Sequence, residues 1–332
     1  MKKKWLSPLA LIFALFLFLA ACGGDNNDSS EGDGDGGDSS TDPDMLQLAT
    51  GGTSGTYYPL GGEMANIISK NTDVSANAIS SNASAENVIS IENGDVDIAF
   101  VQTDVVAHAV EGINAFDEPV EHVLALGSLY PETVQIVTTG DSGIESVEDL
   151  EGRTVSVGAP GSGTYINAEQ ILEVHGLTMD DIDAQNLDFG ESTGGIQDGN
   201  IDAAFITAGT PTGAVEGLSA TVDVAIVPFT QDKIDELVDA YPYYAPDTVE
   251  AGTYGMEEDV ETVAVLAMLA VSDSLSEDLV YDITKALYEN AEGMAHEKSS
   301  FITLDNALDG IGIDLHPGAQ KYFDEEGIEL DN

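Results

Sequence analysis

Two glycine-rich loops contain the residues whose types and spacing best suit ligand binding. The first, residues 51–56, offers backbone N–H groups, three hydroxyl groups and the N-terminus of a helical pattern, which together suit an anion. The second, residues 158–164, repeats this arrangement in the second half of the chain. Helix capping by Ser and Thr is the alternative for either loop alone. Because the loops occupy matching positions, we predict one shared ligand, bound by Thr53, Ser54, Gly55, Thr56, Ser162, Gly163 and Thr164.

Further candidates stand at a helix start and at strand ends. Tyr57 and Tyr58 open the helical pattern after the first loop, where a ring can stack on a ligand and its hydroxyl can donate a hydrogen bond. We include Tyr57 in the site, while the choice between the two rings stays open. Gln102 ends an apolar strand and has both a donor and an acceptor, which would suit an amino-acid ligand; a turn role is the alternative. Three residues hold the same topological place in the second half, namely Thr207, Ala208 and Gly209.

The sequence contains few motifs that would support catalysis or metal binding. Residues 140–143 (GDSG) resemble a serine-protease nucleophile motif, but no histidine context suggests a triad. The five histidines have no metal-ligand spacing, and neither loop continues into a phosphate-loop or dinucleotide signature. We therefore predict that the chain is not an enzyme and has no catalytic residue, metal site or cofactor. A hydrolase that uses Ser142 or Ser162 stays as a minor alternative.

The elements that must position these residues alternate short apolar runs with amphipathic stretches, which indicates an α/β architecture. Strand, glycine loop and helix follow one another from Met45 to Asn71, and the same order returns from residue 154 to 175. Further apolar runs lie at 122–130, 133–139 and 260–271, and residues 242–255 are rich in turn residues. Helices are expected near residues 276–295, before a polar tail.

Two such units predict a two-lobed fold in which the last segment returns to the first lobe. We place lobe one at residues 44–137 plus 254–332 and lobe two at 138–253. Ligands of open α/β sheets lie at the carboxyl ends of the strands. The two glycine loops are therefore expected to face each other across a cleft.

The N-terminus is typical of an exported protein. Lys2, Lys3 and Lys4 precede an apolar stretch that ends in small residues before Cys22, so residues 1–21 are predicted to be a signal peptide. The small residues and Cys22 resemble the lipobox of bacterial lipoproteins, which implies a lipid on this cysteine. Cys22 is the only cysteine, so no internal disulfide can form. Residues 22–44 are almost all Gly, Asp, Ser and Asn, which predicts a disordered acidic tether.

The charge is unusually negative. The formal net charge is −52, and three of the nine Lys and Arg residues lie in the predicted signal peptide. Such a chain repels nucleic acid and anionic lipid, and its self-repulsion destabilises the compact state at low salt. Because salt screens this repulsion, we infer that the protein works in brine. With so few cations, a carboxylate ligand is expected to be held by N–H groups and hydroxyls.

Three segments together resemble the TAXI family, the TRAP-associated extracytoplasmic solute receptors. They are residues 48–61 (LATGGTSGTYYPLG), 99–104 (AFVQTD) and 152–164 (GRTVSVGAPGSGT), and the likeness extends over about residues 45–325. The resemblance implies a type II periplasmic-binding-protein fold with a hinged cleft. It also implies that a small carboxylate or amino acid, similar to glutamate or glutamine, is delivered to an ion-coupled TRAP permease.

The expected function is therefore that of an extracytoplasmic, lipid-anchored solute receptor. Its expected partners are the small-molecule ligand, the TRAP permease subunits and the membrane, through the N-terminal lipid, whereas nucleic acid is excluded. The alternative is a receptor of the same fold that serves an ABC transporter or a signalling system.

Overall fold

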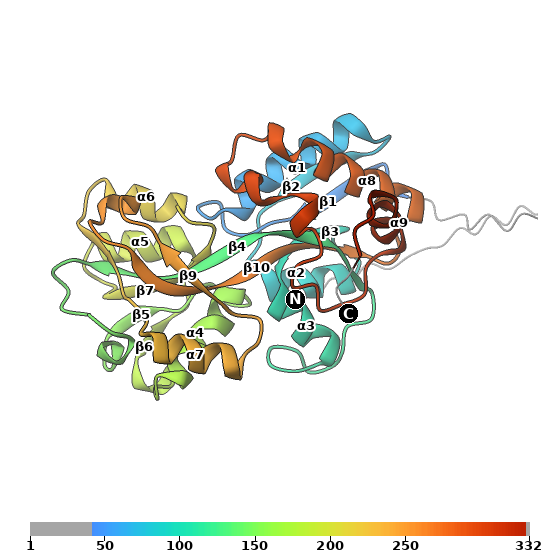
Figure 1. The fold of residues 1–332 in the computed structure, drawn as a ribbon. Helices are drawn as coiled ribbons and strands as arrows, with labels where there is room; N and C mark the ends of the chain where they lie inside the picture. The colour runs from blue at the N-terminus through green and yellow to red at the C-terminus, as the bar shows by residue number, and fades with distance from the viewer. Residues whose placement is uncertain (1–41, 330–332) are drawn as a thin grey trace, which may run out of the picture. The chain divides into compact units, whose positions relative to one another are not determined.

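The fold is built around two long antiparallel strands, β4 (Val123–Thr139) and β10 (Val260–Ser272). The structure is a computed structural model that describes residues 42–329, all within one compact unit. Figure 1 shows β4 and β10 side by side, with the elements of lobe one around one end and those of lobe two around the other. The chain therefore passes between its lobes within one continuous sheet.

Within residues 42–329, the sheet has ten strands, with the order β2-β1-β3-β10-β4-β7-β5-β6, while β8 pairs with β4 and β9 with β10. Pairing is parallel between β1, β2 and β3 and between β5, β6 and β7, whereas β4 and β10 run antiparallel to their neighbours. The other strands are β1 (Met45–Ala49), β2 (Ser75–Ile79), β3 (Ile98–Gln102), β5 (Thr154–Ser156), β6 (Asp183–Gln185), β7 (Ala203–Ala208), β8 (Val224–Ile226) and β9 (Ala245–Val249).

Helices cover both faces of the sheet in each lobe. In lobe one, α1, α8 and α9 share one core with the sheet, and α2 and α3 share the core on the opposite face. In lobe two, α4 and α7 cover one face, and α5 and α6 the other. The helices are α1 (Tyr57–Asn71), α2 (Ser84–Glu92), α3 (Thr103–Glu111), α4 (Gly163–Val174), α5 (Phe189–Gln197), α6 (Gly213–Ser219), α7 (Gln231–Ala240), α8 (Glu277–Asn290) and α9 (Pro317–Glu326).

Residue alternation explains how one strand serves two cores. In β7, Ala203 and Phe205 belong to the core under α4 and α7, whereas Ala204 and Ile206 belong to the core under α5 and α6. Successive side chains of a strand point to opposite faces, so a strand buried on both sides is apolar throughout. The α/β prediction and the two-lobed architecture are confirmed.

Several predicted elements agree closely with the structure. The helix predicted at residues 57–71 is α1, which buries Leu60, Met64 and Ile68 at helical spacing. The strands predicted directly before the two glycine loops are β1 and β5. The exact lobe boundaries at 137/138 and 253/254 stay a prediction.

Other segments contain more regular structure than their sequence indicated. The runs at 122–130 and 133–139 form the single strand β4, which continues through Pro131. Proline lacks an N–H donor, but Pro131 pairs with β10 only, because β7 begins its pairing at Thr133. The turn-rich segment contains β9, and the polar tail contains α9, whose Phe323 packs edge-on against Tyr288 of α8 with ring centroids 5.4 Å apart.

The predicted signal peptide and Cys22 lie outside the described residues, as does most of the predicted tether. Its last residues are described, and Asp42 accepts a hydrogen bond of 2.8 Å from the backbone N–H of Ser276, which precedes α8. The folded part therefore begins by residue 42. Within residues 42–329, no helix is long and apolar enough to cross a membrane.

We expect this protein to become more stable as salt concentration rises. Across the described residues, only six carboxylate side chains form ion pairs, so most of the acidic charge has no cationic partner. Raising KCl from about 0.1 to about 3 M shortens the Debye length from about 10 Å to under about 3 Å. Thermal unfolding should show Tm increasing by on the order of 10 °C, which corresponds to a few kcal/mol.

The control for this experiment is pH. At about pH 4, many carboxylates are protonated and the repulsion is smaller, so the same salt increase should raise Tm less. An equal increase at pH 4 and pH 7 would show that salt acts by a mechanism other than charge screening.

Candidate functional site

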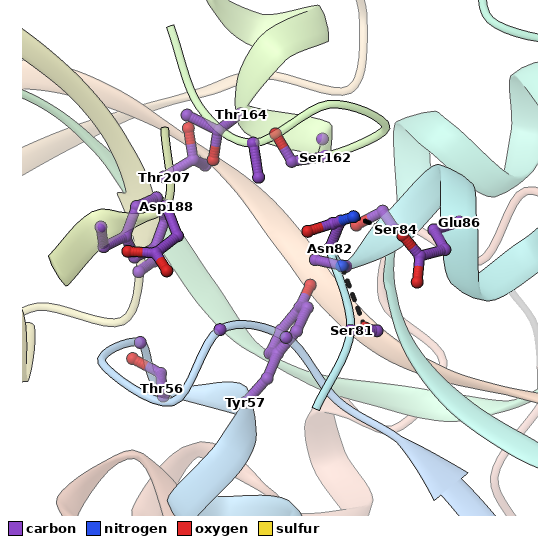
Figure 2. A pocket seen from close by; sticks show the side chains of 18 of the residues that line it. Thr56, Tyr57, Ser81, Asn82, Ser84, Glu86, Ser162, Thr164, Asp188 and Thr207 are labelled. Atoms are coloured by element: carbon purple, nitrogen blue, oxygen red, sulfur yellow. Dashed lines mark hydrogen bonds between the residues drawn. The ribbon is translucent and has the colours of Figure 1, made fainter. Parts of the chain in front are cut away.

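A cavity of about 350 Å³ lies between the two lobes, and both glycine loops line it. In Figure 2, Tyr57 of α1 lies on one side of the space, and Ser162, Thr164 and Thr207 of lobe two lie on the other. The two loops therefore meet at one cavity, as predicted. The predicted residues that line it are Thr53, Gly55, Thr56, Tyr57, Gln102, Ser162, Gly163, Thr164, Thr207 and Ala208.

Two predicted residues, Ser54 and Gly209, are not in the lining of this cavity. Ser54 lines a second, neighbouring cavity together with the start of α6. The Gly209 carbonyl accepts hydrogen bonds from the hydroxyls of Thr56 (3.2 Å) and Thr212 (2.9 Å). Both residues therefore lie where the lobes contact each other rather than at the cavity wall.

Each glycine loop caps a helix of the opposite lobe. The Ser54 carbonyl of the first loop accepts a hydrogen bond from the N–H of Ala214 in α6 (3.1 Å). The Gly161 carbonyl of the second loop accepts hydrogen bonds from the N–H groups of Ala85 (3.1 Å) and Glu86 (3.2 Å) in α2. The first N–H groups of a helix need acceptors from outside the helix. These contacts therefore satisfy the two helix starts only when the lobes are together.

The second loop is shorter than predicted. Gly163 and Thr164 belong to the first turn of α4, because Ser162 caps this helix by accepting a hydrogen bond of 3.2 Å from the N–H of Tyr165. Capping, the alternative given above, thus explains the Ser162 hydroxyl. As for the hydrolase alternative, Ser142 likewise accepts a hydrogen bond from a nearby backbone N–H, that of Ile144 (3.2 Å).

Two of the predicted residues present unpartnered polar atoms. Gln102 at the end of β3 and Thr207 in β7 are 2% and 5% exposed. Among the residues that the structure describes, Gln102 Oε1 and Thr207 Oγ1 have no hydrogen-bond partner. Buried polar atoms without partners are uncommon in folded proteins. Both atoms are therefore available to a ligand at the carboxyl ends of two strands, where ligands of such sheets bind.

The most informative residue of the cavity was not predicted. Glu132 of β4 lines the cavity, is 2% exposed, and accepts a hydrogen bond of 2.7 Å from the Tyr57 hydroxyl. Burial raises the pKa of Glu132 to about 8, and the nearby charge of Asp104 also raises it. The sequence signal that could have identified Glu132 is an acidic residue between two apolar runs. Such a segment is expected to be buried, and charged residues are rarely buried without a partner.

A buried polar network beside the cavity connects the lobes through Asn167 of α4. Its amide oxygen accepts from Gln102 Nε2 (3.1 Å), and its amide nitrogen donates to Asp104 Oδ2 (3.2 Å) and to the Tyr244 hydroxyl (2.8 Å). Burial raises the pKa of Asp104 to about 6. Because Gln102 and Asp104 belong to lobe one and Asn167 to lobe two, this network forms when the lobes close.

The connection between β2 and α2 also lines the cavity and was not predicted. It contributes Ser80, Ser81, Asn82 and Ala83, and Ser84 follows as the first residue of α2. Ala83 has φ 72° and ψ −145°, a conformation that residues with a side chain rarely adopt. The signal that could have identified this segment is a short polar run between a strand and a helix, the same position that the first glycine loop occupies.

The charge of the cavity lining is negative. Glu86, Glu132 and Asp188 line it, and none of the described lining residues is a Lys, Arg or His. In residues 42–329, no group of three or more His, Cys, Asp or Glu side chains could hold a metal ion. As expected from the sequence, the described lining offers no cation to the carboxylate of a ligand. The ligand would also share the cavity with acidic side chains.

Known proteins are similar to this chain in sequence and in structure over nearly all of the described residues. The sequence model of the NMT1-like family matches residues 48–327. PhnD1 from Prochlorococcus marinus (MIT 9301), solved in complex with methylphosphonate, is similar in structure, with a TM-score of 0.51, 10% identity, and coverage of 86% of this chain and 97% of that one. A protein from Bordetella bronchiseptica RB50 gives a TM-score of 0.50, 17% identity, and coverage of 85% and 82%. The architecture matches the two-lobed fold of periplasmic binding proteins.

Proposed function

Because the chain belongs to the NMT1-like family and has a periplasmic-binding-protein fold, we propose that it is an extracytoplasmic receptor for a small carboxylate or amino acid. The observation that carries this proposal is the cavity between the lobes, which both glycine loops line. Its size is within the range of small-molecule sites. Glutamate and glutamine are the ligand types that the sequence resemblance favours.

The carboxylate of such a ligand has donors available in both lobes. The starts of α1 and α4 border the cavity, and no side chain of the described residues caps the start of α1. Backbone N–H groups at a helix N-terminus, together with the helix dipole, favour an anion. The hydroxyl groups of Thr53, Thr164 and Thr207 add polar contacts at the same cavity. A carboxylate can thus be held without an Arg or Lys side chain.

Closure follows from the same geometry. A ligand shifts the balance between open and closed lobes only if it binds the closed state more tightly. Here the cavity walls come from both lobes, so the full set of ligand contacts exists only in the closed state. The reciprocal caps from Ser54 and Gly161 then add hydrogen bonds that hold the lobes together.

Delivery to a TRAP-type permease, with the receptor held at the membrane through lipidated Cys22, is the second part of the proposal. It is supported by the sequence resemblance and by the N-terminal pattern. A receptor for an ABC transporter or a signalling system is the alternative. Proteoliposomes separate them, since a TRAP system needs an ion gradient for receptor-dependent uptake, whereas an ABC system needs ATP.

Direct binding tests the receptor proposal. Titration calorimetry in about 2 to 4 M KCl, where the repulsion between acidic groups is screened, should show binding of L-glutamate, L-glutamine or a related carboxylate in a one-to-one ratio. Affinities from micromolar to nanomolar are expected, or about −8 to −12 kcal/mol. If no member of a panel of amino acids and carboxylates binds, the proposed ligand class is wrong.

A further inference from the structure

The inner part of the cavity is rich in hydrogen-bond acceptors. Gln102 Oε1 has no partner in the described structure, and Glu132 accepts a hydrogen bond of 2.7 Å from the Tyr57 hydroxyl. Asp104 does not line the cavity, but it lies close enough for its charge to raise the pKa of Glu132. The unpartnered Gln102 Oε1 can accept a hydrogen bond from a ligand in the cavity, and Glu132 can accept one once it has lost its proton. A ligand that brings donor hydrogen atoms to this end of the cavity therefore fits it.

In the described part of the chain, none of the groups that face Glu132 carries a positive charge. They are Tyr57 from α1, Gln102 from β3, Asp104 from α3 and Tyr130 from β4 itself. Burial raises the pKa of both tyrosines, so they stay neutral near pH 7. A buried carboxylate without a cation is unstable as an anion and takes up a proton instead. Before a ligand arrives, Glu132 is therefore protonated at neutral pH.

We propose that Glu132 and Gln102 form a subsite for a protonated amino group of the ligand, and that this group displaces the proton of Glu132 into solvent. The inference rests on the proposed receptor function and specifies which end of the ligand binds where. The ligand's ammonium keeps its three protons, Glu132 loses one to water, and the buried carboxylate gains a cationic partner. Amino-acid binding thus releases one proton, while the carboxylate of the ligand binds at the helix starts.

Two expected properties distinguish a specific ammonium subsite from a cavity in which the amino group of the ligand adds no affinity. Affinity should depend on the amino group, because an analogue without it gives Glu132 no cationic partner and gives Gln102 Oε1 no ammonium donor. Affinity should also rise with pH, because binding releases a proton. With the pKa of Glu132 raised to about 8, Kd should fall by up to about tenfold per pH unit between pH 6 and 7.5.

Calorimetry on the full chain tests both properties. The probes are two matched pairs that differ only in the amino group: L-glutamate with glutarate, and L-glutamine with glutaramate. Titrations at pH 7 in buffers with different ionisation enthalpies count the protons. We expect each amino acid to bind at least about tenfold more tightly than its partner, with release of about 0.9 proton per ligand.

The variant Glu132→Gln removes the titrating group but keeps an acceptor for the Tyr57 hydroxyl. We expect it to release no proton, to lose the pH dependence of Kd, and to bind the amino acids no more tightly than their deaminated partners. The matched control is Glu151→Gln, an exposed residue of a surface turn, which should behave as the unaltered chain does. Proton counting on the unaltered chain needs no variant, so poor folding of Glu132→Gln would not remove the test.

The outcomes distinguish this inference from the receptor proposal. Binding of glutarate as tightly as glutamate, or binding of an amino acid without proton release, would overturn the subsite and leave the receptor function standing. Binding of none of the four probes would contradict the ligand class, and the subsite would fall with it.

Discussion

Replacing Gly163 with Ala is expected to weaken ligand binding roughly 30-fold to several-hundred-fold. A Cβ atom at this position would overlap the side-chain amide of Gln102, which belongs to the opposite lobe. To close, the lobes would have to displace Gln102 from its hydrogen bond with Asn167. Overpacking costs about 1–3 kcal/mol and a lost hydrogen bond about 1 kcal/mol, so the closed state should lose about 2–4 kcal/mol.

The measurement is Kd by calorimetry, together with the thermal stability of the ligand-free protein. Gly163 lies in the first turn of α4, where Ala also favours the helix, so the ligand-free Tm should fall little. The matched control is Gly62→Ala in α1, where the added Cβ meets no atom within 4 Å. An unchanged Kd for Gly163→Ala would show that the closed, ligand-bound state differs from this structure around Gln102.

Replacing Asn167 with Ala is expected to lower the free energy of unfolding by about 3 kcal/mol at pH 7. Asn167 is fully buried and hydrogen-bonded to Gln102, Asp104 and Tyr244, so its loss leaves several buried polar groups without partners. Each unsatisfied group costs about 1–3 kcal/mol, and a charged one costs more. Urea unfolding measures the change, and the exposed Asn66→Ala in α1 is the control, expected within about 0.5 kcal/mol of the unaltered chain.

The pH dependence of this loss tests whether the Asp104 charge is its main source. Its pKa in the folded protein is raised from 3.8 to about 6, so its contribution to stability is greatest below about pH 4 and declines as pH rises to about 6. The Asn167 hydrogen bond lowers this pKa, so removing it raises the pKa further. The difference between Asn167→Ala and the unaltered chain should therefore shrink at pH 5. A difference that is the same at pH 5 and pH 7 would contradict a role for the Asp104 charge.

Local patterns in the sequence were sufficient for elements that bury one face at a regular spacing. Helix α1 was predicted with its observed bounds, because Leu60, Met64 and Ile68 repeat at the helical period. The pairing of the two glycine loops at one cavity was also predictable, because strand ends of an α/β sheet meet at one edge. Elements that depend on contacts with distant segments were missed. Strand β9 contains Pro246 and Asp247, and it forms because β10 supplies its partner.

The sequence also could not show which atoms of the predicted site residues make contacts, or with which partners. Ser54 was predicted as a ligand contact, yet its backbone carbonyl holds α6 of the other lobe. Ser162 was predicted in the same role, and its hydroxyl caps α4. A hydroxyl can donate, accept or cap, and which of these it does depends on the groups that the fold brings within 3 Å or so. Residue type alone leaves these roles open.

The sequence by itself determined the α/β class, the repeated strand, loop and helix, the strongly acidic charge, and the near absence of cations around any ligand. These are properties of composition and of short-range order, so they are readable without coordinates. Only the tertiary structure decided that Glu132, Gln102 and Asn167 lie together, since they belong to β4, β3 and α4. The groups around a buried carboxyl group raise its pKa and make a cationic ligand a favourable partner. Packing decides which groups these are.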